Sequence, residues 1–251
     1  MPVRIDPAIL RQIIRPALAI RKGSDSHIKI GSDTIRLRAT SEDKTVYLDH
    51  SLPRPDTQPP VNNDIGSFWL RLEHIESFLN VGTSTEVTIT FPSETSGSMV
   101  TLQSDGLTYR FPPLIQQYRL FEDPSNDAVT EFSIQHGVFH RGVQVANLVG
   151  EAMRLRIVPD THDIEFSSDS QGDGDAFYYS LSTDQITLVN GGSSSFTVPI
   201  DRLRDITPLV PNTSLASFQL TSNCLVYHVE HPVSEAQLTV YIAERLDRLR
   251  E

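Results

Sequence analysis

Residue types that do chemistry occur in this chain of 251 residues, but few are spaced for catalysis or metal binding. The stretch SSDSQGDGDAF holds Asp169, Asp173 and Asp175 among glycines and could suggest a calcium loop. It lacks the spaced acidic series and the final glutamate of an EF-hand loop, so a solvated hairpin turn is favoured. The eight histidines are scattered, and none has HExxH or a comparable metal-binding spacing.

Candidate nucleophiles give no better case for an enzyme. Cys224 is the single cysteine and stands at the start of an expected strand, which favours a small core residue over a nucleophile. Serines are plentiful, yet no GxSxG elbow and no glycine-rich phosphate loop is present. The sequence therefore predicts a protein without catalytic residues, metal or cofactor.

Basic residues form one informative stripe, on the first expected helix. Arg11, Arg15 and Lys22 are spaced i, i+4 and i+11, which brings them within about 40° of one another on a helix of ~3.6 residues per turn. The stripe lies opposite the apolar face of that helix. It is either an ordinary solvated face or a surface that donates hydrogen bonds to phosphate oxygens without reading bases.

The elements that must carry these residues are mostly strands. Segments such as EVTITF, LTYRF and LASFQLTS alternate apolar and polar residues, which is typical of half-buried antiparallel strands. Four stretches have helical periodicity: about 7–20, 73–80, 137–149 and 201–209.

Local signals set the expected ends of two helices. Asp6 is a plausible N-cap for the first helix, and Pro7 suits the first helical position. Pro16 is expected to kink or shorten that helix, because it removes a backbone donor. Asp201 is expected to cap the fourth helix.

The order of elements repeats along the chain. Residues 1–112 and 128–251 each have the order of an α+β lobe, βαβββαβββ, and the sequence identity between the halves is low. Residues 113–127 form the predicted connecting loop, which begins at the proline pair 112–113 and includes the turn-forming stretch DPSND.

Composition limits the environment and the partners. The formal net charge is −11, and lysine occurs only at Lys22, Lys29 and Lys44. This bias is typical of salt-adapted proteins, although an ordinary acidic protein with arginine-rich codon usage would share it.

The chain lacks a run of ~20 apolar residues and a signal-peptide pattern, so we expect a cytoplasmic protein. The acidic balance argues against nonspecific coating of DNA, but not against a local basic patch.

Four stretches in this order resemble one known family. They are IRLRATSEDKTVYLDHSL (35–52), LEHIESFLNVGTSTEVTITF (72–91), GLTYRFPPLI (106–115) and LVYHVEHPVSEAQLTVYIAERL (225–246). The chain resembles the archaeal type of the DNA sliding clamp, the proliferating cell nuclear antigen (PCNA) family, from a halophile or its virus. In the tail, Ala243 and Glu244 stand where the family usually has Ala-Pro.

The resemblance implies an architecture and a function. Each subunit has two similar lobes, with helices on one concave face and antiparallel sheets outside. Three subunits close head to tail into a homotrimeric ring around duplex DNA, which is bound without regard to sequence. The ring tethers DNA polymerase, and it serves replication and repair.

The resemblance also implies a lining for the pore. The implied DNA-binding residues are Arg11, Arg15, Arg21, Lys22, His140, Arg141, Gln144, Arg202 and Arg204. On the second helix, the family positions that are often lysine fall near Ser77 and Asn80, with Glu73 and Glu76 close by. A weakly basic lining is therefore expected. It suits a salt-adapted clamp, because at ~1 M salt the Debye length is only about 3 Å and the attraction between basic side chains and phosphates is heavily screened.

Two strands are implied as the contact between subunits, over 107–111 and 177–181. The implied interface residues are Tyr109, Arg110, Phe111, Phe177, Tyr178 and Tyr179. Unpaired edges this apolar invite partner strands. The alternative is that both strands simply pair within their own lobes.

Partner enzymes of the family, including the clamp loader, dock a short peptide with apolar and aromatic anchors. The implied pocket residues are Thr45, Val46, Leu120, Phe121, Leu225, Ala243 and Glu244. Because Glu244 replaces a proline, the peptide preference is not set by the resemblance.

Two other functions remain open. A divergent paralogue or virus-encoded clamp could form heteromers or bind only some partners. A β-rich structural protein, such as a capsid component, is a different class, against which the matched helices of the two lobes argue.

Overall fold

The computed structural model describes residues 2–20, 25–31, 33–53, 66–82, 84–92, 97–114, 128–158, 160–170, 174–191, 195–231 and 235–244. The chain divides into two compact units, Met1–Phe121 and Glu122–Glu251. Residues 115–127 of the predicted connecting loop lie outside the described residues, so its bounds stay a prediction.

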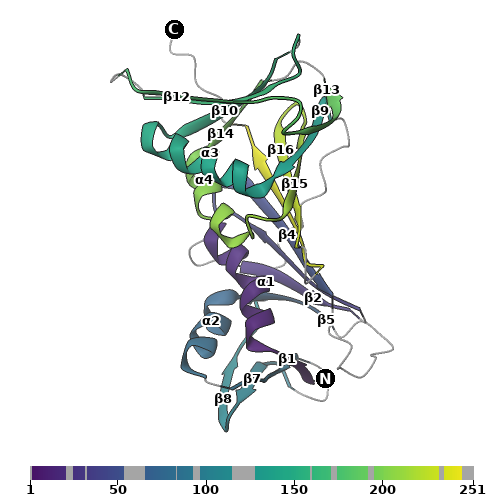
Figure 1. Ribbon diagram of the computed structural model, residues 1–251. Helices are drawn as coiled ribbons and strands as arrows, with labels where there is room; N and C mark the ends of the chain where they lie inside the picture. Colours follow the sequence, from purple (N-terminus) through teal and green to yellow (C-terminus); the bar gives the residue numbers. More distant parts are fainter. Residues whose placement is uncertain are drawn as a thin grey trace. The chain divides into compact units, whose positions relative to one another are not determined.

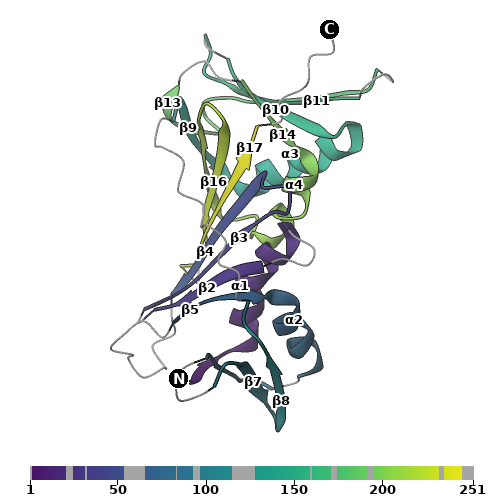
Figure 2. The ribbon, with the colours of Figure 1, turned by 180° about the vertical axis from the view of Figure 1, so that it is seen from behind.

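The first unit contains two helices and eight strands within its described residues (Figure 1). They are β1 (Pro2–Ile5), α1 (Pro7–Ile20), β2 (Asp25–Ile30), β3 (Thr34–Thr40), β4 (Val46–Pro53), β5 (Gly66–Arg71), α2 (Leu72–Val81), β6 (Val87–Thr90), β7 (Val100–Ser104) and β8 (Leu107–Phe111). The strands pair antiparallel in the orders β1-β6-β7-β8 and β4-β3-β2-β5. Figure 2 shows β2, β3, β4 and β5 side by side from behind.

The second unit repeats this plan with one additional strand among its described residues. Its elements are β9 (Thr130–Gln135), α3 (His136–Val149), β10 (Ala152–Ile157), β11 (Ile164–Asp169), β12 (Ala176–Leu181), β13 (Thr187–Gly191), β14 (Ser195–Pro199), α4 (Ile200–Arg204), the 3₁₀ turn η1 (Thr207–Leu209), β15 (Leu215–Leu220), β16 (Cys224–Glu230) and β17 (Gln237–Ala243). The strands pair in the orders β12-β11-β10-β14 and β13-β9-β15-β16-β17.

The α+β class expected from the sequence is confirmed, but the expected strand count is corrected. Each unit has a further strand before its second helix, β5 in the first and β14 in the second, and β13 is added beside β9. In β5 the side chains of Phe68 and Leu70 alternate with those of Ser67 and Trp69, which is the pattern of a strand with two different faces. This segment satisfies its backbone groups by pairing with β2 instead of running free as a connector.

Helix α1 spans all of Pro7–Ile20, as expected, so Pro16 does not shorten it. Asp6 caps the helix as predicted, because its Oδ1 accepts a hydrogen bond from the backbone N–H of Ala8 at 2.7 Å. Pro16 is itself buried, as are Ile13 and Ala17 on the apolar stripe. Burial of this stripe against β3 and β4 offsets the backbone hydrogen bond that Pro16 cannot make.

The fourth helix is shorter than expected, and its predicted cap is wrong. The N-cap is Pro199, and Asp201 lies within the first turn of α4. The helix ends at Arg204, and the chain continues into the 3₁₀ turn Thr207–Leu209. Pro208 explains the break, because it has no backbone N–H to donate to the carbonyl oxygen of Arg204, four residues earlier.

Each unit buries its own apolar layer beneath its helices. In the first unit, Ile75, Phe78 and Leu79 of α2 are buried. In the second, Phe139 of α3 packs against the rings of Phe218 and Tyr227 at centroid distances of 4.6 and 5.5 Å. Helices α1 and α2 contact each other in one unit, and α3 and α4 do so in the other (Figure 1). Each helix pair therefore turns a polar face away from its sheet.

Candidate functional site

Helix α1 carries two arginines in different settings. The Nη2 atom of Arg11 donates a hydrogen bond of 2.5 Å to the carbonyl oxygen of Leu79, in the last turn of α2. Cations are favoured at this end of a helix, where carbonyl groups are left unpaired. Arg15 is exposed and has no hydrogen bond or ion pair within the described part of the chain. Of the remaining predicted pore residues in this unit, Arg21 and Lys22 lie outside the described residues.

Helix α2 supplies no cation to the polar face. Ser77 and Asn80 are exposed, as is Glu76, while Glu73 is half-buried. The face that α1 and α2 present is therefore of mixed charge, with Arg15 as its exposed arginine.

The helices of the second unit hold the other predicted DNA-binding residues. On α3, Arg141 and Gln144 are exposed, whereas His140 is half-buried and its Nδ1 lies 2.9 Å from the Oγ1 of Thr207. One ring nitrogen of His140 therefore serves the contact of α3 with the turn after α4. On α4, Arg202 is half-buried and Arg204 is exposed.

Both α4 arginines contact an aspartate next to them in the sequence. The Nε of Arg202 lies 3.7 Å from Oδ2 of Asp201, and the Nε of Arg204 donates to Oδ1 of Asp205 at 3.0 Å. The hydrogen bond to Asp205 raises the pKa of Arg204 above its ordinary value. The aspartates were not predicted as part of the site, although the sequence DRLRD shows them on both sides of the arginines.

His136 is a buried polar residue that the sequence analysis did not single out. Its Nε2 lies 3.0 Å from the carbonyl oxygen of Thr207, and its Nδ1 lies 2.8 Å from the hydroxyl of Tyr227. A carbonyl only accepts, so Nε2 carries the proton and Tyr227 donates to Nδ1. Burial lowers the pKa of His136. The neutral ring thus links α3, η1 and β16, and nothing in its sequence spacing marks it.

The two strands predicted to meet another subunit both lie at the edge of a sheet. Strand β8 ends the order β1-β6-β7-β8, and β12 ends the order β12-β11-β10-β14. Asp105 and Gly106, both with positive φ, form the tight turn that leads into β8. Within the described residues, each strand therefore presents backbone groups along one edge that no neighbouring strand satisfies.

The aromatic side chains on these edges are not equivalent. Tyr178 of β12 is 75% exposed, and Tyr109 of β8 is 37% exposed and hydrogen-bonded through its hydroxyl to Nδ1 of His74 at 2.8 Å. Phe111 is only 2% exposed and stacks on His74 at a centroid distance of 4.8 Å, so its side chain belongs to the core of the unit and not to a contact surface. Three further predicted interface residues remain at least partly exposed: Arg110, Phe177 and Tyr179.

Two predicted residues of the peptide pocket are not on the surface. Val46 and Leu225 are fully buried, so a docked peptide cannot contact them directly. Thr45, Ala243 and Glu244 are half-buried, and Leu120 and Phe121 lie outside the described residues.

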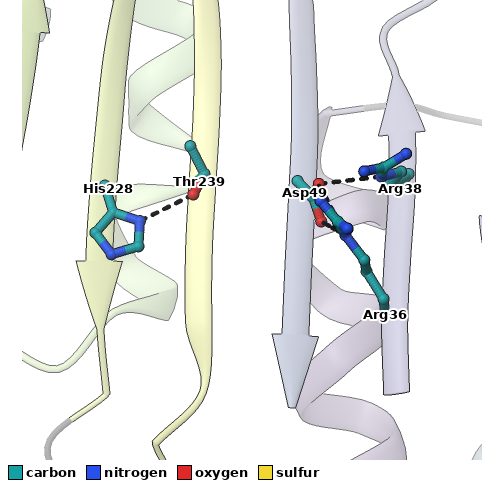
Figure 3. Close-up of polar contacts among 5 residues, drawn as sticks. All are labelled: Arg36, Arg38, Asp49, His228 and Thr239. Carbon is teal, nitrogen blue, oxygen red and sulfur yellow. Dashed lines mark hydrogen bonds and ion pairs between the residues drawn. The ribbon is translucent and has the colours of Figure 1, made fainter. Parts of the chain in front are cut away.

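The sheet in the first unit has an ionic cluster that the sequence analysis missed. The carboxylate of Asp49 on β4 accepts hydrogen bonds from both Arg36 and Arg38 of β3 (Figure 3). The two arginines are two residues apart, so their side chains lie on the same face of the strand. The Nε of Arg36 lies 2.7 Å from Oδ1, and the Nε of Arg38 lies 3.0 Å from Oδ2. In the second unit, His228 bonds Thr239 of the next strand at 2.9 Å in a similar way (Figure 3). These contacts hold neighbouring strands together.

Other chemical functions find little support. Burial raises the pKa of Cys224 to about 11, which keeps the thiol protonated and unreactive near neutral pH. Among the described residues, no group of three or more histidine, cysteine or acidic side chains could hold a metal ion. Within the same residues, no helix has the length and apolar character needed to cross a membrane.

We compared the chain with known proteins to find which of them it resembles. No protein-family model matches the chain. Over 189 residues it is 24% identical to the DNA polymerase sliding clamp of Natronomonas pharaonis, covering 73% of this chain and 74% of that protein.

Solved structures match over almost the full length. A structure of the C-terminal region of FEN-1 bound to A. fulgidus PCNA matches with a TM-score of 0.81 and 13% identity, over 98% of both chains. PCNA from Thermococcus kodakaraensis has a TM-score of 0.74 at 16% identity, over 97% of this chain and 99% of that one. A PCNA2-PCNA3 complex from Sulfolobus tokodaii gives 0.73 at 15% identity, over 98% and 99%.

These matches confirm the resemblance inferred from the sequence. The chain has the fold of the PCNA family of DNA sliding clamps over nearly its whole length, and it is similar in sequence to an archaeal clamp over 73% of its residues.

Proposed function

We propose that this chain is the subunit of a DNA sliding clamp, which encircles duplex DNA and tethers replication and repair enzymes to it. One observation carries the proposal: the paired α+β units match a PCNA chain over 98% of their length, and the sequence independently matches a DNA polymerase sliding clamp.

Encirclement explains why the chain needs no catalytic residues. A closed ring slides along DNA but cannot leave it, so a bound polymerase stays at a high effective concentration near its template. The protein itself makes and breaks no covalent bond. Such a clamp acts wherever the chromosome lies, which in a cell without a nucleus is the cytoplasm.

The polar faces of the helix pairs are the surface that we assign to DNA. Arg15 and Arg141 are exposed there, and Gln144 can donate to phosphate oxygens. Contacts of this kind carry no base readout. Because they are few, the ring can still slide along the DNA. Arg11 and His140 are assigned a structural role instead, because each is bound within its own unit.

The ring is closed by edge strands in our proposal. The free edge of β8 in one subunit pairs with the free edge of β12 in the next, and Tyr109 and Tyr178 pack across the junction. A head-to-tail contact of this kind uses two different surfaces, so it repeats until the rotation closes the ring. We propose three subunits.

Partner enzymes would dock on the sheet side through a short peptide. The A. fulgidus PCNA that resembles this chain is described as bound to the C-terminal region of FEN-1. Thr45, Ala243 and Glu244 remain candidates for the rim of such a site, since all three are partly exposed. We propose DNA polymerase and the clamp loader as partners of the same kind.

The test combines a mass with a topological measurement. Light scattering on the purified chain should give three times its mass of 28.1 kDa. The protein, loaded onto nicked circular DNA, should co-elute with the DNA and should be released when a restriction enzyme linearises the circle. An uncut circle is the control. A monomer, or equal retention on circular and linear DNA, would contradict encirclement.

A heteromeric clamp is a second candidate. One matching structure is a complex of two different PCNA chains, PCNA2 and PCNA3. If the purified chain is a stable monomer or dimer that forms a ring only with a second clamp protein of the same cell, this alternative replaces the homotrimer.

A further inference from the structure

The arginines of the helices fall into two groups. Arg15 and Arg141 are exposed and have no hydrogen bond or ion pair among the described residues, whereas Arg202 and Arg204 on α4 each contact a carboxylate. In the Arg204–Asp205 pair, both side chains are about half exposed, at 54% and 47%. The pair lies in water at the polar surface of the helices, so a phosphate group can reach it.

A phosphate that approaches α4 meets both charges of the Arg204–Asp205 pair, and beside the less exposed side chain of Arg202 (27%) it meets Asp201, which is 57% exposed. An exposed ion pair is weak, so Arg204 can exchange the carboxylate for a phosphate oxygen. The carboxylate of Asp205 then stays within a few ångströms of the phosphate and repels it, and Asp201 acts likewise beside Arg202. The arginines therefore hold phosphate less firmly than isolated arginines would.

We propose that Asp201 and Asp205 are positioning residues that weaken the hold of Arg202 and Arg204 on the DNA backbone, so that contacts at α4 are quickly exchanged during sliding. This inference rests on the proposed clamp function. On a surface that faces DNA, acidic residues would otherwise only oppose binding. The inference gives Asp201 and Asp205 a role on that surface.

The test removes the two carboxylates without changing side-chain size. We compare the wild type with the double variant Asp201→Asn/Asp205→Asn in binding to a short blunt-ended duplex at about 0.1 M salt. The variant should bind about 3- to 10-fold more tightly, because two repulsive charges are lost beside the phosphates. The gain should vanish at ~1 M salt, where charges are screened within about 3 Å.

The chain offers a matched control. Arg4–Glu86 at 3.7 Å and Arg156–Glu165 at 3.9 Å are exposed ion pairs whose residues lie on strands or next to them and not on a helix. The variant Glu86→Gln/Glu165→Gln changes the net charge by the same amount and also releases two arginines. Its affinity for the duplex should equal that of the wild type.

The outcomes separate this inference from the clamp function. Tighter binding by the helix variant alone supports it, and an equal gain in both variants, or no gain in either, overturns it. Thermal unfolding of all proteins checks that the fold is unchanged, and the single variant Asp205→Asn replaces the double one if α4 is disturbed. Failure of the wild type to remain on circular DNA would instead overturn the clamp function.

Discussion

At the scale of single residues, two arginines one helical turn apart have different partners. Arg11 is bound to the carbonyl oxygen of Leu79, and Arg15 faces solvent. Spacing alone made them equivalent members of one basic stripe. Their separation into a structural and a DNA-facing residue depends on α2, whose last turn lies within reach of Arg11 but not of Arg15.

Substitution of each arginine should reveal this division. Arg11→Ala should lower the free energy of unfolding by about 1–2 kcal/mol, because it removes a charge-assisted hydrogen bond to the carbonyl oxygen of Leu79. Arg15→Ala should leave stability within about 0.5 kcal/mol of the wild type and weaken binding to a short duplex. Urea denaturation and duplex titration measure the two effects. Equal stability losses in both variants would show that Arg11 has no special structural role.

His136 makes stability depend on pH. Burial lowers its pKa below the ordinary value of about 6.5, so the folded ring stays neutral while the unfolded one takes up a proton as the pH falls. His27 and His228 also have pKa values lowered by burial. The unfolded state therefore binds more protons below pH ~6.5, and stability must fall there.

The expected pH profile is specific to this residue. Between about pH 7 and pH 5.5, the wild type should lose stability, with each such histidine contributing at most ~1.4 kcal/mol per pH unit. His136→Gln should be less stable at pH 7, because Tyr227 and Thr207 lose their partner, but its profile should be flatter. Denaturant titrations at several pH values measure this. A variant profile parallel to that of the wild type would contradict the assignment.

At the scale of elements, the edges of the two sheets decide assembly. The tight turn at Asp105-Gly106 fixes β8 against β7, which leaves the other edge of β8 without a partner in its sheet. Strand β12 ends its own sheet in the same way, and Tyr178 is 75% exposed on it. Exposed apolar edges of this length tend to pair with another chain.

A charge on each edge should prevent assembly. The double variant Tyr109→Asp/Tyr178→Asp should be a folded monomer, because pairing would bury two carboxylates without partners. Leu215→Asp is the control: Leu215 is 62% exposed but lies on β15, inside its sheet order and not at an edge. Light scattering gives the masses. A trimer that persists in the double variant would place the interface elsewhere.

At the scale of the whole molecule, topology and charge are separable. The chain has a formal net charge of −11, and its helices carry few exposed arginines without acidic neighbours. Binding by charge alone would therefore be weak, particularly in concentrated salt. Encirclement needs no ion pair with DNA, so a salt-adapted clamp can retain DNA with this surface.

Salt should distinguish the two modes of binding. Retention on closed circular DNA should change little between about 0.1 M and about 1 M salt, because a ring is held by topology. Affinity for a short linear duplex should fall steeply over the same range as phosphate contacts are screened. Gel filtration of loaded circles and duplex titration provide the two curves. Parallel losses on both substrates would mean that the protein binds by charge and not by encirclement.

The sequence by itself determined the features that depend on neighbours along the chain. The bounds of α1 and its cap at Asp6 follow from periodicity and backbone preferences over a few residues. The order of elements, repeated in two halves, was also visible, and it was enough to indicate the fold. The strand β5 was missed because Phe68, Trp69 and Leu70 are consecutive apolar residues, which hides the alternation of a half-buried strand.

Only the tertiary structure decided which polar residues are bound internally and which remain for a partner. Arg11 meets Leu79, 68 positions away, and His136 meets Tyr227, 91 positions away. Val46, Phe111 and Leu225 were predicted at contact surfaces and are buried instead. Local patterns specify the direction of a side chain within its own element, but its exposure depends on the elements that pack over it, and those are distant in the sequence.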